Sequence, residues 1–192
     1  MTTSPAPAPY TEPWLCGTHA DVPAAGRAVL HALELSLDDL TKWTAGLTDA
    51  EVHSAPLGLT PISYHLRHIA RSVDRILTYA EGGQLSQQRV AALNAEKTGT
   101  ELDGAKQDGA EQGEEGSQES LAELFAEVEV SFSDAADRIR VLATADLNTP
   151  RFVGRKQLPT SIGGAMIHVA DHTQRHTGQV VTTAKVIKAL RI

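Results

Sequence analysis

The spacing of apolar residues constrains the fold of this 192-residue chain most strongly. In four long segments they recur every three or four residues, which places them on one face of an α-helix. The segments cover roughly residues 23–47, 60–83, 120–143 and 160–188. No stretch of any length alternates apolar and polar residues as a strand would. The sequence therefore predicts an all-α fold, and four helices of this length predict a four-helix bundle.

Short polar side chains at the segment starts predict helix caps. The candidates are Asp21 before Pro23, Thr60 before Pro61, Ser120, and either Thr160 or Ser161. Ser120 also has Glu123 three residues later, the spacing of a capping box. Gly82-Gly83 is expected to end the second helix, since glycine commonly follows a helix C-terminus.

The links between the segments differ in length, and this constrains the topology. About a dozen residues join the first helix to the second and the third to the fourth, whereas more than thirty separate the second from the third. A link of that length can run the full height of a bundle, so the second and third helices can be parallel. An up-down-down-up bundle is the expected arrangement.

Residues 98–119 are dominated by Gly, Glu, Gln and Asp. Such a composition cannot bury enough apolar surface to offset the entropy of ordering, so we predict a disordered or flexible acidic loop between the second and third helices. A short helix over residues 87–96 is expected just before it. We further expect residues 1–20 to form a flexible N-terminal segment and residues 21–192 to form a single domain.

Composition narrows the classes of partner. The net charge is −7, and no stripe of Lys and Arg with interleaved aromatic residues is present, so nucleic acid is not an expected partner. No apolar run approaches the length of a membrane span, and the N-terminus lacks the pattern of a signal peptide; a cytoplasmic protein without a membrane partner is expected. Cys16 is the only cysteine, so neither an intrachain disulfide nor a cysteine-based zinc site can form.

Three histidines in the fourth segment point to metal chemistry. His168, His172 and His176 follow one another at four-residue intervals, so their rings lie in one stripe that we expect to face inward. Each buried ring needs partners for two nitrogens, and one metal ion can satisfy several rings at once. His65 or His68 in the second helix can add a further nitrogen. Periodicity makes His65 the more buried of the two but does not decide which one reaches the ion.

The pattern is not that of a zincin, because Val169 and Thr173, not Glu, follow the first histidine of each pair. Metal-bound water would then be the main nucleophile or base. Gln179 could orient that water, or hold a ligand ring by a hydrogen bond. The remaining histidines are scattered along the chain and are expected to be exposed or incidental: His19, His31 and His53.

Two motifs resemble those of the DinB/YfiT-like superfamily of metal-dependent enzymes. Leu66-Arg67-His68-Ile69-Ala70 is similar to its apolar-His-apolar-Ala motif in the second helix. The run from Asp171 to Gln179 is similar to its late motif, a His-x-x-x-His pair followed by one residue and Gly-Gln. The resemblance covers most of the chain from about Ala25 onward, except for the acidic insertion.

Residue by residue, the resemblance implies that His68, His172 and His176 are the metal ligands. His65 falls where the family usually has a core leucine, and His168 becomes a supporting or core residue. The resemblance also implies the up-down-down-up bundle, a homodimer, and a divalent ion, zinc or nickel, with water in the open positions. Some relatives transfer low-molecular-weight thiols, or isomerise or conjugate small molecules.

The leading hypothesis is therefore a metal-dependent enzyme, a thiol S-transferase or hydrolase that acts on a small molecule. The alternative is a non-catalytic helical bundle, a binding or interaction protein that keeps its histidines as hydrogen-bonded core groups. A third hypothesis is a structural metal site, in which His65 or His168 completes tetrahedral coordination.

Overall fold

A computed structural model describes residues 10–87, 89–90 and 119–191. Four long helices account for most of these residues: α1 (Ala24–Thr44), α3 (Ile62–Ala80), α5 (Leu121–Leu142) and α6 (Ile162–Leu190). The prediction of a mostly helical fold is thus confirmed. The predicted acidic loop, apart from its last residue, and most of the predicted helix over residues 87–96 lie outside the described residues.

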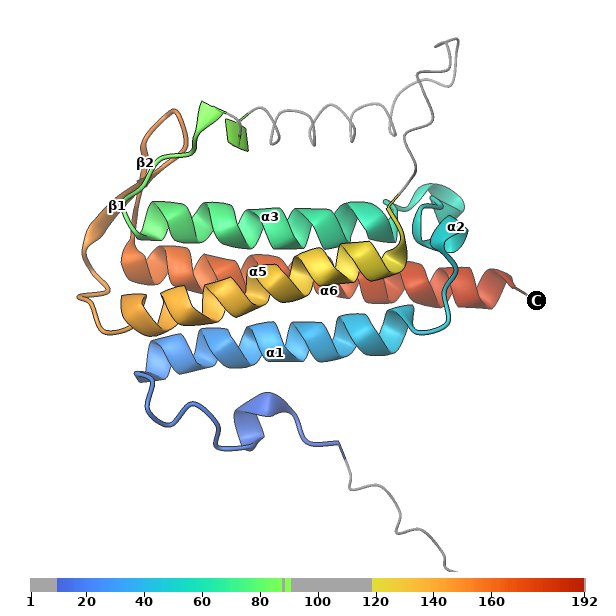
Figure 1. Cartoon of the computed structure of the whole chain (residues 1–192), viewed down its shortest axis with the longest axis horizontal. Coiled ribbons are helices and arrows are strands. Elements are labelled where there is room, and N and C mark those ends of the chain that lie inside the picture. The colour runs from blue at the N-terminus through green and yellow to red at the C-terminus, as the bar shows by residue number, and fades with distance from the viewer. Residues whose placement is uncertain (1–9, 88, 91–118, 192) are drawn as a thin grey trace, which may run out of the picture.

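The four long helices lie side by side (Figure 1). α6 packs against both α1 and α3, and α5 packs against α3 and less extensively against α1. α1 and α6 run in one direction, and α3 and α5 run in the other, as the colour gradient of Figure 1 shows. This arrangement makes α3 and α6 neighbours, although they are distant in sequence.

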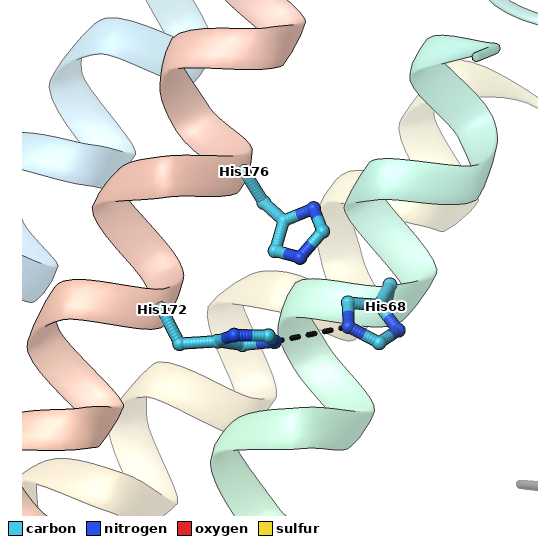
Figure 2. Close-up of side chains that lie close together, drawn as sticks. All are labelled: His68, His172 and His176. Carbon is cyan, nitrogen blue, oxygen red and sulfur yellow. Dashed lines mark hydrogen bonds between the residues drawn. The ribbon is translucent and has the colours of Figure 1, made fainter.

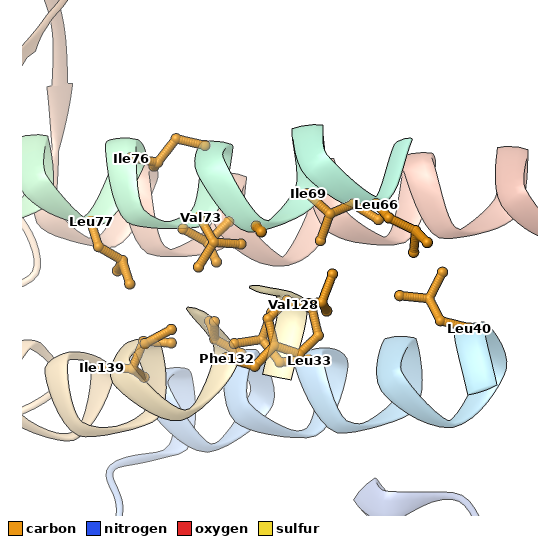
Figure 3. Close-up of a cluster of buried hydrophobic side chains, with 14 of the residues drawn as sticks. Leu33, Leu40, Leu66, Ile69, Val73, Ile76, Leu77, Val128, Phe132 and Ile139 are labelled. Atoms are coloured by element: carbon orange, nitrogen blue, oxygen red, sulfur yellow. The ribbon is translucent and has the colours of Figure 1, made fainter. Parts of the chain in front are cut away.

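An aliphatic core fills the space between these helices (Figure 3). In α3 the residues that face α1 and α5 include Leu66, Ile69 and Val73, each at most 1% exposed. Val128 and Ile139 of α5 are fully buried opposite them. Burying side chains of this size contributes roughly 1.5–3 kcal/mol each, so the core supplies a large share of the free energy that holds α3 in place.

Two of the predicted caps are confirmed. The Ser120 hydroxyl accepts a hydrogen bond from the backbone N–H of Glu123, and the Glu123 carboxylate accepts one from the backbone of Ser120, which completes the capping box. Of the two candidates for α6, Ser161 forms the cap, because its hydroxyl accepts from the N–H of Gly164.

The caps predicted for α1 and α3 are wrong. Pro23 and Pro61 occupy the cap positions themselves in extended conformations, and neither helix start has a side-chain cap. The Asp21 carboxylate instead accepts a hydrogen bond from Arg140 of α5. A capping side chain accepts from the N–H of the second or third helical residue, and proline has no side chain that can do so. Its fixed φ is nevertheless compatible with the position just before the first helical residue.

The link before α6 contains a β-hairpin, which corrects the expectation of a chain without strands. β1 (Pro150–Val153) pairs in antiparallel register with β2 (Leu158–Ser161), with Phe152 opposite Pro159. The turn between them uses positive φ angles at Gly154 and Gln157. Arg151 donates a hydrogen bond to the carbonyl of Ala80, which attaches the hairpin to the end of α3. Each strand has four residues, too few for alternation to be visible in the sequence.

The described residues also contain several shorter elements. The link from α1 to α3 contains α2 (Asp49–Val52) and the 3₁₀ turn η2 (Pro56–Gly58). A further 3₁₀ turn, η1 (Pro13–Leu15), lies in the N-terminal segment, where the Tyr10 hydroxyl donates to Asp38 of α1. The domain boundary near residue 20 stays a prediction. Within the described residues, no helix combines the length and apolar character that crossing a bilayer requires.

Candidate metal centre

Three histidines from the adjacent helices α3 and α6 converge on one point (Figure 2). His68 comes from α3, and His172 and His176 come from consecutive turns of α6. Each offers a ring nitrogen that lies within 4.8 Å of the nitrogens offered by the other two. His68 Nε2 and His172 Nε2 are 3.0 Å apart, and the His176 ring centroid is 4.5 Å from that of His68 and 4.6 Å from that of His172.

These distances fit a shared metal ion. An ion that binds imidazole nitrogens at about 2.0–2.1 Å in tetrahedral geometry separates two of them by about 3.3 Å. The 3.0 Å between the Nε2 atoms of His68 and His172 is close to that value. The three imidazoles therefore form a donor set that fits a divalent ion.

Metal binding needs a neutral imidazole with a free lone pair, and two of the three rings, those of His172 and His176, have a lowered pKa that favours this form. Burial, followed by repulsion from His176 and His68, lowers the pKa of His172 to about 4. Burial, followed by the charges of His68 and Arg175, lowers the pKa of His176 to about 4, against the opposite effect of a hydrogen bond with Gln179. Near neutral pH both rings are uncharged.

His168 does not join this group. The buried residues of α6 form a stripe centred about 80° from His172, so His176 lies about 40° nearer to that stripe and His168 about 40° farther away. The His168 side chain is consequently 50% exposed, with its Nδ1 3.6 Å from a carboxylate oxygen of Asp171. The expectation that all three histidines of this helix face inward is wrong for His168.

His65 is buried next to the three histidines. It is 3% exposed and His68 is partly exposed, which confirms the prediction that His65 is the more buried of the two rings. His65 Nδ1 lies 3.0 Å from His176 Nδ1. Burial and the nearby His176 and His68 lower the pKa of His65 to about 4.

Tyr64 is a residue of this region that the sequence reasoning missed. Its ring stacks on the His68 ring, with 5.5 Å between centroids and 15° between planes. The signal was available in the sequence, since Tyr64 lies four residues before His68 and side chains at this spacing are neighbours on a helix. The stack restricts the orientation of the His68 ring.

A polar pocket of about 300 Å³ lies beside His65, and none of His68, His172 and His176 lines it. His65 and Gln179 lie in its wall and link it to His176. Arg175 contributes a positive charge, and Thr60 and Thr182 contribute hydroxyl groups. Its volume is at the lower end of the range for sites that bind small molecules.

A second group of possible ligands, His19, His31 and Glu34, is explained without a metal. Arg140 donates to His19 Nδ1 over 2.8 Å, so the proton of this neutral ring lies on Nε2 and is donated to Glu34 over 2.6 Å. Both nitrogens of His19 are then used. His31 is 8% exposed, so of the two alternatives expected for it, exposed or incidental, the first is wrong.

Comparison with known proteins places these observations in a family. No curated protein matches the chain. The family model of the DinB superfamily matches residues 32–180, which is more than half of the chain. The matched region starts within α1, ends within α6 and includes His68, His172 and His176. The chain belongs to the DinB superfamily.

Proposed function

We propose that this protein is a metal-dependent enzyme that holds a divalent ion, zinc or nickel, with His68, His172 and His176. The proposed reaction is either the transfer of a low-molecular-weight thiol to a small molecule or the hydrolysis of a small molecule. The observation that carries the proposal is the convergence of three ring nitrogens from two helices within 4.8 Å. The proposed scaffold is an up-down-down-up four-helix bundle, and the proposed assembly is a homodimer.

The number of ligands supports catalysis over a structural role. Structural zinc sites generally use four protein ligands, whereas catalytic sites use three and leave a position open for water or substrate. A divalent ion bound here would lower the pKa of a coordinated water or thiol and so supply a nucleophile near neutral pH. His168, one candidate for a fourth ligand, is half exposed and directed toward Asp171.

The surrounding residues fit the binding of a small polar substrate. The pocket beside His65 presents the guanidinium of Arg175 and the hydroxyls of Thr60 and Thr182. A substrate or thiol with a carboxylate would complement the charge of Arg175. Gln179 lines this pocket and forms a hydrogen bond with His176, so it connects a molecule bound in the pocket to the ring of a proposed ligand.

The second candidate function is a non-catalytic binding protein. It is favoured by the two close imidazole pairs, His68 with His172 and His65 with His176, each with nitrogens 3.0 Å apart. In such a pair one neutral ring can donate a proton to the other, which satisfies one nitrogen of each ring without an ion. This candidate predicts that the histidines affect stability and that the protein has no metal-dependent activity.

Activity assays on zinc- and nickel-loaded protein test the proposal. The assays are a thiol-transfer screen and a hydrolysis screen with untagged protein that has been purified without a nickel column. We expect turnover that chelator abolishes, that His172→Ala removes and that His168→Ala retains. Absence of metal-dependent turnover with every thiol and ester tested, in protein that binds metal, would contradict the enzyme and favour a structural metal site. Protein that neither binds metal nor turns over a substrate would favour the non-catalytic binding protein.

A further inference from the structure

His65 is the most deeply buried histidine of the centre and is not one of the three converging ligands. It lies one turn before His68 on α3, and its Nδ1 is 3.0 Å from Nδ1 of His176 on α6. The Tyr64 ring meets it edge-on at 5.4 Å between centroids. His65 is therefore a buried polar side chain with a specific partner, the ring of His176.

The tautomers of this pair follow from the position of His176. Its Nδ1 faces His65, and Figure 2 shows its other ring nitrogen directed toward His172 and His68. If Nε2 of His176 is to offer a lone pair to an ion, the proton of this ring lies on Nδ1. That N–H then donates to Nδ1 of His65, and the proton of His65 lies on its own Nε2.

We propose that His65 is a positioning residue that fixes the tautomer and ring orientation of His176 for metal binding. This inference rests on the proposed function, because it assumes that His176 is a ligand. Metal-bound histidines usually donate their second N–H to a carboxylate, a backbone carbonyl or water, and such partners orient the ligand ring. In this protein the neutral imidazole of His65 is the acceptor for the second N–H of His176. At 3% exposure, water has little access to replace it.

The geometry separates this role from that of a fourth ligand. His65 approaches the side of the His176 ring that is turned away from His68 and His172. A ligand would have to lie on the same side as those two rings. His65 thus supports the centre from behind His176 and also lies in the wall of the polar pocket.

Two substitutions at this position test the role. His65→Asn places an amide near the position of Nδ1 and can still accept a hydrogen bond, whereas His65→Leu has a similar volume and no acceptor. The measurement is the affinity for Zn²⁺ alone, by competition with a chelating dye. We expect His65→Leu to weaken zinc binding by about 10–100-fold and His65→Asn to restore most of the loss. His31→Leu, a change at a buried histidine outside the centre, should leave the affinity unchanged.

Other outcomes overturn the inference. Unchanged affinity in His65→Leu excludes a positioning role. Equal losses in both variants, with a Co²⁺ absorption spectrum that reports a changed ligand number, make His65 a fourth ligand. A loss in Gln179→Ala and none in His65→Leu assigns the positioning role to Gln179. If the wild-type protein binds no zinc, the proposed function itself is contradicted. The three outcomes above, by contrast, leave a zinc-binding protein and contradict only the role proposed for His65.

A measurement on wild-type protein covers the case in which His65→Leu does not fold. Nitrogen-15 NMR of the zinc-loaded protein reports which nitrogen of each imidazole carries the proton. We expect the proton on Nδ1 of His176 and on Nε2 of His65. A proton on Nδ1 of His65 would contradict the proposed hydrogen bond.

Discussion

At the scale of single residues, four neighbouring histidines differ in how deeply they are buried. His65 is enclosed and pairs with His176, whereas His172 and His176 are partly exposed and turn toward His68. His168, one turn earlier on the same helix as His172, is half exposed. The same side chain is thus enclosed, partly exposed or half exposed according to its angle on the helix.

The stability of the metal-free protein should fall as pH is lowered from about 6.5 to about 4. Burial lowers the pKa of His65, His172 and His176 from 6.5 to about 4 in the folded chain. Between these values the unfolded chain binds more protons than the folded chain, so protonation favours unfolding. Urea titrations at a series of pH values measure the effect.

The double variant His172→Ala/His176→Ala is the control for this pH dependence. Without these two rings the free energy of unfolding should depend less steeply on pH over the same interval. A free energy of unfolding in the metal-free wild type that stays level, or rises, as the pH is lowered through this interval would show that the rings are not buried as described.

At the scale of elements, the sequence predicted the helices well and their connections poorly. Each long helix spans five turns or more, so its apolar period repeats often enough to be recognised. The four-residue strands of the hairpin repeat no period, and their pairing depends on turn geometry at Gly154 and Gln157. Short-range signals therefore identify helices and caps such as Ser120, but not a short hairpin fixed by Arg151.

The candidate site, like the fold, was predicted from the sequence only in part. Helical spacing alone placed three histidines of α6 in one stripe and ranked His65 as more buried than His68. It could not tell which ring of α3 faces α6, because that depends on how the two helices pack. The resemblance to a family supplied His68, and the structure brings His68 together with His172 and His176.

Ser120→Ala should destabilise the protein by about 1 kcal/mol, because it removes the hydroxyl of the capping box at the start of α5. Chemical denaturation measures the change. Ser133→Ala, an exposed position inside the same helix, is the matched control and should be neutral or slightly stabilising. Equal effects of the two substitutions would mean that the cap contributes nothing specific.

Gly26→Ala should destabilise the contact between α1 and α5. A Cβ atom at this position would lie 2.5 Å from Cβ of Ala143 and 3.0 Å from Cγ1 of Val22, so the two helices would have to separate. Overpacking of this kind costs roughly 1–3 kcal/mol, which thermal or chemical denaturation detects.

Gly178→Ala in α6 is the matched control, because a Cβ atom there would meet nothing within 4 Å. We expect it to be stabilising by up to about 1 kcal/mol, the difference in helix propensity between alanine and glycine. If Gly26→Ala were as well tolerated as Gly178→Ala, the close approach of α1 and α5 would be contradicted.

At the scale of the whole molecule, the candidate centre joins helices that are far apart in the chain. His68 and His172 are separated by 104 positions, and they meet because α3 and α6 pack side by side. An ion held by both helices would therefore cross-link them. Metal binding should then be coupled to the stability of the fold as a whole.

Zinc should raise the melting temperature of the protein by several degrees. A ligand that binds only the folded chain stabilises it by about 2.7 kcal/mol at a concentration 100 times its dissociation constant. Calorimetry with and without zinc measures the shift, which chelator should reverse. His172→Ala should abolish the shift and His168→Ala should retain it. An equal shift in both variants would locate the bound zinc elsewhere.

The metal content of untagged protein, purified without a nickel column and measured by elemental analysis, tests the central claim most directly. Three ligands at one site predict about one equivalent of zinc or nickel per chain, as purified or after loading. The triple variant His68→Ala/His172→Ala/His176→Ala should then hold almost none. Wild-type protein with less than about a tenth of an equivalent, not restored by added zinc or nickel, would contradict a metal centre at these histidines.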